Sequence, residues 1–295
     1  MIMYKTCPVC HSPAINKVLT AADHTVSNEK FEIWQCAACS LRFTQNIPAQ
    51  SEIGRYYRSE NYISHSNTGK GLINSIYLLV RRFTLSSKRK FVQRITGTVK
   101  GRLLDIGAGT GAFLHEMKHA GWQVEGVEPD SQAIKNAAAV HGLNLHPADH
   151  LFRLTHGGFD AITMWHVLEH VHELHEYIEQ LKLLCKPGGK IFIAVPNYTS
   201  YDAEYYVSSW AAYDVPRHLY HFSPAAMIAL ITSHGCRIDS IHPMWFDSFY
   251  VSLLSEKYKT GSSNIIHGFW KGFRSNSKAL SNKRKASSII YVISV

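Results

Sequence analysis

The stretch Arg102-Leu103-Leu104-Asp105-Ile106-Gly107-Ala108-Gly109-Thr110-Gly111-Ala112-Phe113-Leu114 decides the expected fold of this chain. It begins with apolar residues typical of a buried strand and passes, through three glycines at every second position, into a helical pattern. Glycine adopts the positive φ angles of a sharp turn without strain, and the start of a helix presents unpaired backbone N–H groups. The stretch therefore predicts a loop that holds a cofactor.

The spacing of the glycines separates two kinds of cofactor loop. The dinucleotide fingerprint Gly-x-Gly-x-x-Gly is met in part, because Ala112 stands at its third glycine position. With an acid at the end of the strand and a further glycine in the loop, the stretch resembles motif I of the class I S-adenosylmethionine-dependent methyltransferases. In these enzymes the loop wraps the methionine part of the cofactor. The resemblance implies that the cofactor is bound by Asp105, Gly107, Ala108, Gly109 and Gly111.

A second predicted strand, residues 122–128, also ends in an acid. Glu128 follows Asp105 by 23 residues, close to the spacing of about 20 residues at which dinucleotide folds place a ribose-binding acid. A carboxylate at this point can accept hydrogen bonds from both ribose hydroxyls. We expect Glu128, together with the adjoining Pro129, to bind the cofactor.

Residues 101–295 alternate strand and helix patterns, which indicates a parallel sheet with helices on both faces. The resemblance implies an α/β, Rossmann-like sheet of seven strands, mostly parallel with a reversed last strand. Beyond the opening stretch, strands are expected at 122–128, from 143, at 159–166, 190–195, 237–241 and 287–294, and helices at 111–121, 131–141 and 224–234.

Two Cys-x-x-Cys pairs lie near the start of the chain, with 25 residues between them. Four thiolates at this spacing suit tetrahedral Zn²⁺, and four protein ligands make the site closed and structural. A redox pair or disulfides are the alternatives, but residues 1–10 lack a signal-peptide pattern, which favours a reducing, cytoplasmic location. The expected zinc ligands are Cys7, Cys10, Cys36 and Cys39.

These patterns divide the chain into three parts. Residues 1–50 form the predicted zinc ribbon, and residues 51–100 a tyrosine-rich and basic helical linker or lid. Residues 101–295 form the predicted S-adenosylmethionine-binding catalytic domain, with insertions at 196–222 and 242–286.

The formal charge of +9 is unevenly distributed. Residues 61–104 contain nine Lys/Arg and no acid, and residues 257–295 contain eight and no acid. Such segments could bind an anionic substrate, an anionic membrane surface or RNA. The alternative is that they are basic helix faces that contact only solvent. No window approaches the 18 apolar residues of a membrane-spanning helix.

Further cofactor contacts are implied by the resemblance alone. Asp149 falls where the family often places an acid near the adenine amine. Trp165 and His166 end the fourth strand, and the run from His166 to Val171 resembles a motif of methyltransferases that act on quinone precursors and sugars. In those families the first residues of the motif line the cofactor and substrate cavity. His166 and His170 also form an i, i+4 pair that a metal could use, although Glu169 between them does not match the zincin pattern.

The insertion at 196–222 carries the candidate base. The segment from His218 to Ser223 resembles the one that holds the active-site histidine of zinc-ribbon sugar C-methyltransferases, but Val215 and Arg217 stand where those enzymes have Tyr and Glu. We expect His218 to act as the catalytic base, helped by Asp214 or Tyr213, and Arg217 to hold an anionic group of the acceptor. The alternative is that His218 only packs or caps the loop.

These observations predict a methyltransferase that uses S-adenosylmethionine and acts on a small acceptor, anionic or nucleotide-linked, such as a sugar or a quinone-like molecule. An RNA methyltransferase is disfavoured because the fourth strand ends in Met-Trp-His-Val, without the Asn/Asp-Pro-Pro-aromatic motif used on base amines. A non-catalytic module that binds the same cofactor is the other alternative. The oligomeric state is not predicted.

Overall fold

The computed structural model describes residues 1–57, 72–262 and 264–295, with only the backbone described for residues 72–82. It divides into two compact units. The ribbon unit comprises Met1–Tyr62, His166–Ile178 and Ile193–Ile293, and the glycine-turn unit comprises Ile63–Trp165, Glu179–Phe192 and Ser294–Val295. Part of the predicted basic linker, residues 58–71 and the side chains of residues 72–82, therefore lies outside the described residues.

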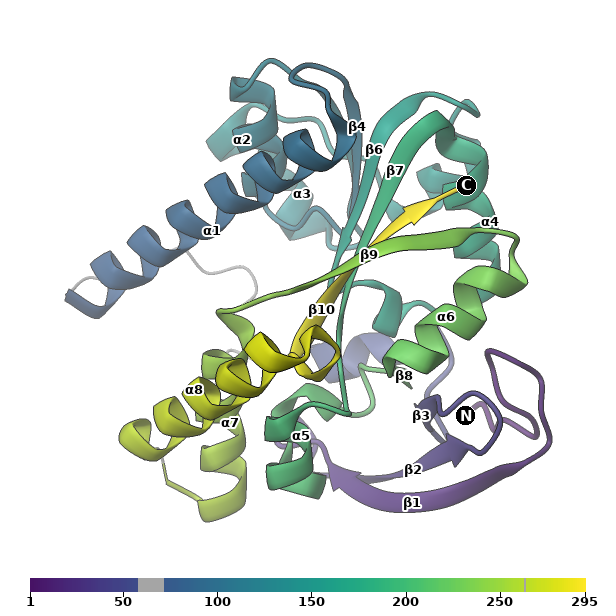
Figure 1. Cartoon of the computed structure of the whole chain (residues 1–295), viewed down its shortest axis with the longest axis vertical. Helices are drawn as coiled ribbons and strands as arrows, with labels where there is room; N and C mark the ends of the chain where they lie inside the picture. Colours follow the sequence, from purple (N-terminus) through teal and green to yellow (C-terminus); the bar gives the residue numbers. More distant parts are fainter. Residues whose placement is uncertain (58–71, 263) are drawn as a thin grey trace. The chain divides into compact units, whose positions relative to one another are not determined.

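The larger sheet has six strands in the order β5-β4-β6-β7-β10-β9 (Figure 1). β4 pairs in parallel with β5 on one side and β6 on the other. β10 runs against β7, because the Asn197 N–H donates to the Ser287 carbonyl at 2.8 Å and the Lys190 ammonium donates to the Ser294 hydroxyl at 2.7 Å. The strands are β4 (Arg102–Ile106), β5 (Gln123–Val127), β6 (Phe159–Trp165), β7 (Cys185–Pro196), β9 (Arg237–Pro243) and β10 (Ser288–Ser294).

The predicted α/β class and the reversed last strand are confirmed, but the count of seven strands is wrong for the described residues. The segment from Leu143 makes only an isolated parallel bridge, between His146 and Val127. Pro147 follows at once, and because proline has no N–H the ladder cannot continue. The chain turns instead into a short 3-10 helix, η3 (Ala148–Arg153).

The glycine-turn unit places three helices around its strands. α1 (Leu72–Thr96) precedes β4, α2 (Ala112–His119) follows it, and α3 (Ser131–His141) follows β5. α3 has the predicted bounds because Asp130 caps its first turn through the Gln132 N–H and Gly142 ends it at φ 60°. α4 (Leu174–Leu184) leads into β7.

The ribbon unit contains a second sheet, in the order β1-β2-β3-β8. β1 (Ile15–Ala22), β2 (Lys30–Cys36) and β3 (Arg42–Thr44) come from the predicted ribbon, whereas β8 (Tyr220–His221) comes from the insertion at 196–222. β3 and β8 pair antiparallel, with Arg42 opposite His221 and Phe43 opposite Tyr220. The ribbon and the insertion are therefore parts of one sheet.

One hydrophobic cluster also joins these segments. It contains Phe31 and Ile33 of β2, Tyr56 of the linker, and Trp210 and Tyr213 of the insertion, all buried. The remaining helices of the unit are α5 (Tyr201–Tyr206), α6 (Pro224–Ser233), α7 (Asp247–Thr260) and α8 (Ile265–Ser281). Within the described ranges, no helix combines the length and apolar character needed to cross a membrane.

Candidate functional site

The turn between β4 and α2 has the geometry that the glycine spacing predicts. Gly107, Gly109 and Gly111 have φ angles of 70°, 55° and 76°, values that a residue with a Cβ rarely adopts. A methyl group placed on Gly109 would have no heavy atom within 4 Å. The turn thus leaves open space directly over its backbone, where a ligand can approach.

Glu128 is tied to this turn. One oxygen of its carboxylate accepts the Gly109 N–H at 2.7 Å, and the other accepts the Asp130 N–H at 3.0 Å. The side chain is only 5% exposed. An ionised carboxylate has about four lone-pair sites, so a group of this kind can accept hydrogen bonds from a diol as well as from backbone N–H groups. The donors and acceptors of this turn therefore fit the ribose of a nucleoside cofactor.

Asp105 lies at the end of β4 and is 2% exposed. The Thr163 hydroxyl donates to its carboxylate at 2.6 Å. Burial raises the pKa of Asp105 to about 7, although the Thr163 hydrogen bond and the charge of Lys88 act in the opposite direction. The charge of this carboxyl group consequently changes near neutral pH.

Trp165 ends β6 in an aromatic and cationic environment. The Lys88 ammonium lies 4.3 Å from the centre of its ring, and Phe113 meets the ring edge-on at 5.6 Å. The indole N–H is buried, and it donates to no group among the described residues. Because buried donors are rarely left unpaired, this atom also fits a ligand with an acceptor oxygen or nitrogen.

Ala108 is half-buried in the turn, and two further predicted cofactor residues of this unit are more exposed. Pro129 is exposed at the end of the turn that follows β5. The Asp149 side chain is 63% exposed and pairs with Arg153 in η3. The contact of Asp149 with an adenine amine stays a prediction.

The four ribbon cysteines come together in the ribbon unit. Their sulfur atoms lie within 4.8 Å of one another, with Cys7 and Cys39 3.5 Å apart and Cys10 and Cys36 3.5 Å apart. Both pairs have the same turn: His11 and Ser40 have positive φ angles, and their N–H groups donate to the carbonyls of Cys7 and Cys36 at 2.9 and 3.0 Å. Four thiol groups on two equivalent turns fit a tetrahedral metal ion.

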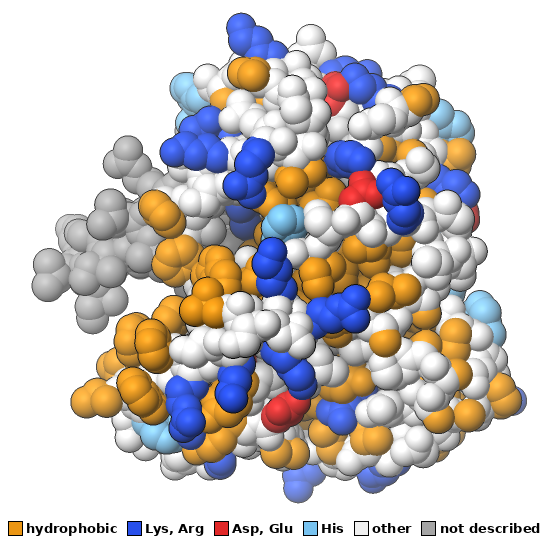
Figure 2. Space-filling model, viewed as in Figure 1, with side chains coloured by type: hydrophobic (Ala, Val, Ile, Leu, Met, Phe, Trp, Pro, Cys, Tyr) orange, Lys and Arg blue, Asp and Glu red, His pale blue; other side chains and the backbone are white. Residues whose placement is uncertain are grey.

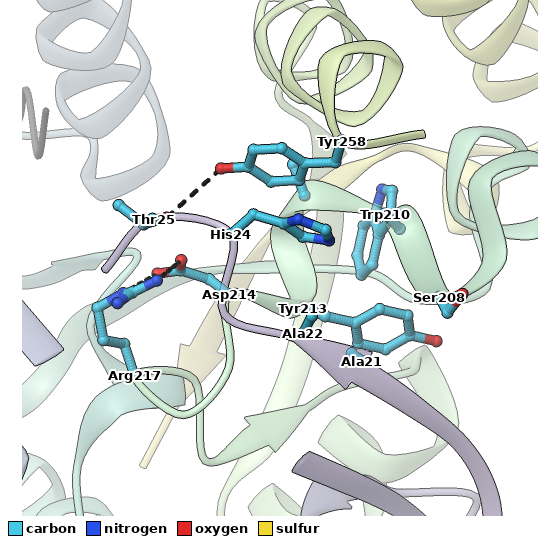
Figure 3. Close-up of a pocket in the computed structure, with 11 residues that line it drawn as sticks. Ala21, Ala22, His24, Thr25, Ser208, Trp210, Tyr213, Asp214, Arg217 and Tyr258 are labelled. Atoms are coloured by element: carbon cyan, nitrogen blue, oxygen red, sulfur yellow. Dashed lines mark hydrogen bonds and ion pairs between the residues drawn. The ribbon is translucent and has the colours of Figure 1, made fainter. Parts of the chain in front are cut away.

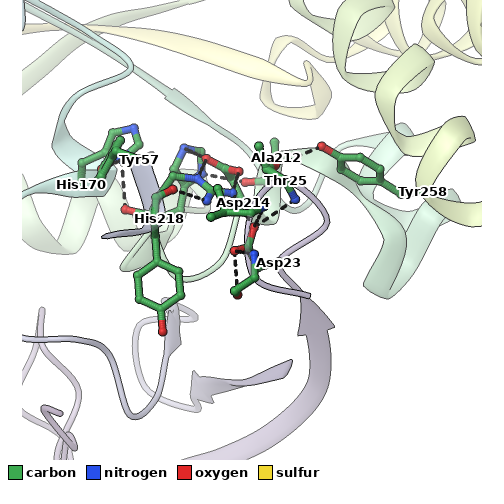
Figure 4. A network of polar contacts seen from close by, with 12 residues as sticks. Asp23, Thr25, Tyr57, His170, Ala212, Asp214, His218 and Tyr258 are labelled. Carbon is green, nitrogen blue, oxygen red and sulfur yellow. Dashed lines mark hydrogen bonds and ion pairs between the residues drawn. The ribbon is translucent and has the colours of Figure 1, made fainter. Parts of the chain in front are cut away.

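His218 is buried in the ribbon unit, and its ring is oriented by the backbone (Figure 4). Its Nδ1 lies 2.8 Å from the Ala212 carbonyl. A carbonyl can only accept, so Nδ1 carries the proton and a neutral ring has its lone pair on Nε2. The Asp214 carboxylate lies 3.9 Å from this Nε2. The arrangement suits a group that takes up a proton at Nε2.

Arg217, expected to hold an anionic group of the acceptor, instead binds other residues of the protein. It is 1% exposed, and it donates to Asp214 at 2.6 and 3.0 Å, to Asp23 at 3.0 Å and to the Tyr56 carbonyl at 2.7 Å. Its guanidinium therefore connects the insertion to the ribbon and the linker. The pKa of Asp214 is lowered because the hydrogen bonds and charge of Arg217 outweigh the effect of burial.

A small pocket adjoins this ion pair (Figure 3). It is lined by residues of β1 and of the insertion, including Trp210 and Asp214, and by Tyr258 of α7. Its volume of about 10 Å³ is enough for roughly one water molecule. This pocket is too small to be an acceptor site.

Tyr213 belongs to a different set of contacts. Its hydroxyl accepts a hydrogen bond from Arg42 of β3 at 2.7 Å, and its ring meets Trp210 and His221 edge-on. The structure thus brings Asp214 next to the imidazole of His218 and gives Tyr213 a partner in the ribbon.

The run after β6 supplies two ionisable groups that the prediction of catalytic residues missed. The His170 ring meets the His218 ring edge-on at 4.5 Å, and its Nδ1 lies 3.0 Å from both the Arg217 carbonyl and the Tyr57 hydroxyl. Burial lowers the pKa of His170 to about 4, so it is neutral. Glu169 is fully buried, and within the described part of the chain neither carboxylate oxygen accepts a hydrogen bond.

His166 also lies beside Glu169. The His166 Nδ1 lies 3.3 Å from the Glu169 carboxylate, and its Nε2 lies 2.8 Å from the Asp247 carboxylate of α7. Burial alone would lower the pKa of His166, but the two carboxylates raise it to about 10. His166, predicted as a cofactor residue, is therefore an imidazolium between two acids.

Glu169, His170 and His218 also form a set of metal donors, with ligand atoms within 4.8 Å of one another. Two imidazoles and a carboxylate suit a divalent transition metal. The sequence contained a clue to this cluster, because two histidines and a glutamate interrupt an apolar run directly after the fourth strand.

The fold and the turn now define a class of protein. A Rossmann-like sheet with a reversed strand, a triple-glycine turn after its first strand and an acid at the end of the next strand is the arrangement of class I S-adenosylmethionine-dependent methyltransferases. The chain belongs to the methyltransferase domain family, which matches residues 80–241.

Curated relatives include methyltransferases. The chain is similar to the ubiquinone biosynthesis O-methyltransferase of Xanthomonas oryzae pv. oryzae, with 27% identity over 160 residues, 50% of this chain and 66% of that protein. It is 31% identical over 116 residues to the Bordetella bronchiseptica enzyme of the same name, covering 36% of this chain and 48% of that one. The match spans less than two thirds of either relative.

A solved S-adenosylmethionine-dependent methyltransferase from Archaeoglobus fulgidus is also similar. It is 21% identical and has a TM-score of 0.49, over 72% of this chain and 93% of that one.

Proposed function

We propose that this protein transfers a methyl group from S-adenosylmethionine to a small acceptor, anionic or nucleotide-linked, of the sugar or quinone type. The observation that carries the proposal is the hydrogen bond between Gly109 and Glu128 across an open glycine turn. The family match supports the reaction. The relatives named as ubiquinone biosynthesis O-methyltransferases support an acceptor with a hydroxyl group.

When bound, the cofactor supplies a methyl group that is electrophilic because it sits on a sulfonium. The residues proposed to hold it are Asp105, Gly107, Ala108, Gly109, Gly111, Glu128, Pro129, Asp149, Trp165 and His166. The main task of the protein is then to align the acceptor, to exclude water and to remove a proton.

His218 is proposed as the base. The Ala212 carbonyl keeps the proton on Nδ1, so Nε2 is the atom that accepts a proton from an acceptor hydroxyl. Asp214 stabilises the imidazolium that forms, since its carboxylate is 3.9 Å from Nε2. Tyr213 contributes through its bond to Arg42, which fixes the start of the loop.

The cysteine cluster is proposed to bind a structural Zn²⁺. All four ligands are protein groups, so the ion has no open position for a reacting water. The ion would instead stabilise β2 and β3, to which β8 is attached.

A methyl-incorporation screen tests the proposal. Purified protein and labelled S-adenosylmethionine are offered nucleotide sugars, catechol-type quinone precursors and RNA, and binding of the cofactor is measured by calorimetry. Transfer to a small acceptor supports the proposal. Transfer to RNA alone, or cofactor binding without transfer to any acceptor, would instead support one of the two alternatives.

A further inference from the structure

The helical insertion after β9 has its small residues inside and its large apolar residues outside. The buried positions of α8 are Gly268, Gly272, Ser275 and Ala279. A methyl group on Gly268 would lie 3.0 Å from the Leu253 Cα, and one on Gly272 would lie 2.8 Å from the Phe249 Cα. α8 therefore packs against α7 through a face that only small residues allow.

The opposite face of α8 is strongly hydrophobic. Ile266 is 85% exposed and Leu280 75%, although isoleucine and leucine are usually buried. We call the α7–α8 patch these two residues together with the other exposed apolar side chains of α7, of α8 and of the two residues before α7: Trp245, Phe246, Tyr250, Ile265, Phe269, Trp270 and Phe273. Large groups of exposed apolar side chains are rare on proteins that act alone in water, and they mark places of interaction.

Basic residues accompany the patch. Lys257, Arg274 and Lys278 are exposed on the same two helices, and residues 257–295 contain no acid. Figure 2 shows hydrophobic and basic side chains gathered at the lower left of the molecule, over α7 and α8. The partner of such a surface must be both apolar and negatively charged.

We infer that the α7–α8 patch binds the surface of an anionic lipid bilayer, with α8 lying in the plane of the interface. An amphipathic helix with aromatic and aliphatic residues on one face and basic residues beside them is the pattern of interfacial binding. The apolar side chains enter the acyl boundary, and the basic residues contact the phosphates of anionic lipids.

A second copy of the chain fits the patch less well. A symmetric dimer brings the same surface to itself, so the lysines and arginines of one α8 would meet those of the other with no acid on either. Single-stranded nucleic acid also fits less well. Its bases stack on aromatic rings, but the most exposed residues of the patch are the aliphatic Ile266 and Leu280.

Vesicle sedimentation tests this inference without any methyl acceptor. The protein is mixed with vesicles of phosphatidylcholine alone or of phosphatidylcholine with phosphatidylglycerol. We expect binding to the second kind, weakened by salt. The variant Ile266→Ser/Phe269→Ser/Trp270→Ser and the variant Lys257→Gln/Arg274→Gln/Lys278→Gln should each lower the affinity by at least about tenfold.

Two controls separate binding from misfolding. Val99→Ser/Val140→Ser removes apolar side chains that are similarly exposed elsewhere and should bind vesicles like the wild type. The tryptophan emission should shift to the blue on binding, and this shift should be smaller in Trp270→Phe, which preserves apolar bulk. Equal binding by the triple serine variant would overturn the inference. So would a patch-dependent dimer in analytical ultracentrifugation, or binding of single-stranded RNA in place of vesicles.

Discussion

The hydroxyl of Thr44 in β3 donates a hydrogen bond to the backbone carbonyl of His218 at 2.8 Å. The same hydroxyl lies 3.1 Å from the His221 Nε2, and Thr44 is fully buried. A residue of the ribbon thus fixes the backbone of the proposed base. The ribbon is therefore expected to affect catalysis although none of its residues is proposed to contact the acceptor.

Replacing Thr44 tests this connection. Thr44→Val keeps the shape of the side chain but leaves the His218 carbonyl without its donor, at a cost of about 1–3 kcal/mol in the free energy of unfolding. We expect slower methyl transfer with unchanged affinity for S-adenosylmethionine. Thr20→Val, in β1, is the matched control and should retain both. A Thr44→Val enzyme with full activity and full stability would contradict the connection.

Removal of the metal should disturb the same loop. We expect purified protein to contain about one zinc per chain. A chelator or the variant Cys36→Ser should increase hydrogen exchange at Tyr220 and His221, because β8 pairs with β3. Cys185→Ser changes a buried cysteine outside the cluster and is the control. Protein that contains no metal but shows full protection at these amides would contradict a structural zinc site.

Glu128 should dominate binding of the cofactor. Glu128→Gln weakens the bond from the Gly109 N–H and removes the charge proposed to accept hydrogen bonds from the ribose, and hydrogen bonds to charged groups contribute about 1.5–3 kcal/mol. Calorimetry should show an affinity for S-adenosylmethionine about 10- to 100-fold lower. Glu125→Gln, on the same strand, removes weaker pairs with Arg102 and His150 at 3.9 and 4.0 Å and should bind normally.

The pKa of Asp105, raised to about 7 by burial, predicts a pH dependence. The cofactor is positively charged and favours the ionised carboxylate, so its affinity should rise about tenfold between pH 6 and pH 8. The stability of the free protein should show the opposite trend. A carboxyl pKa that is raised on folding contributes stability at low pH, which is lost as the pH rises through about 7.

Calorimetry in buffers of different ionisation enthalpy measures the proton released on binding. Asp105→Asn should bind with an affinity that no longer changes over this range. If the wild type shows the same flat profile, the carboxyl group of Asp105 does not change its charge in this range.

His218 can act either as a general base or as one of three metal ligands, and the two roles predict different results. His218→Ala should lower the turnover number about 10²- to 10⁴-fold with unchanged cofactor affinity, as for loss of a general base. If Glu169, His170 and His218 hold a catalytic metal instead, the protein should contain a second metal ion, and its removal should abolish transfer. Metal analysis of wild type and His170→Ala separates the two roles.

Local patterns predicted the elements that depend on local chemistry. The turn after β4 follows from three glycines, the bounds of α3 from Asp130 and Gly142, and the meeting of the four cysteines from their spacing. The exposure of the aromatic residues of α8 could not be predicted from the sequence. An amphipathic pattern shows that a helix has two different faces, but it does not show which face packs against the protein. Here the glycine face is inside, since it alone allows close approach to α7.

The contacts of the candidate base depend on residues far apart in the chain. The sequence predicts that Arg217 holds an acceptor anion, but Asp23, which is 194 positions away, binds its guanidinium. Likewise Thr44 holds the His218 backbone across 174 positions. Pairings over such separations arise from the tertiary fold, and one sequence contains no pattern that reveals them.

The pairing of β3 with β8 has a consequence for how this protein can change. A chain shortened to begin after the ribbon would expose β8 as an open edge and would lose Asp23, Arg42 and Thr44 together. The ribbon and the loop that contains His218 therefore cannot be exchanged one at a time between related enzymes. A working chimera would have to transplant both as a single piece.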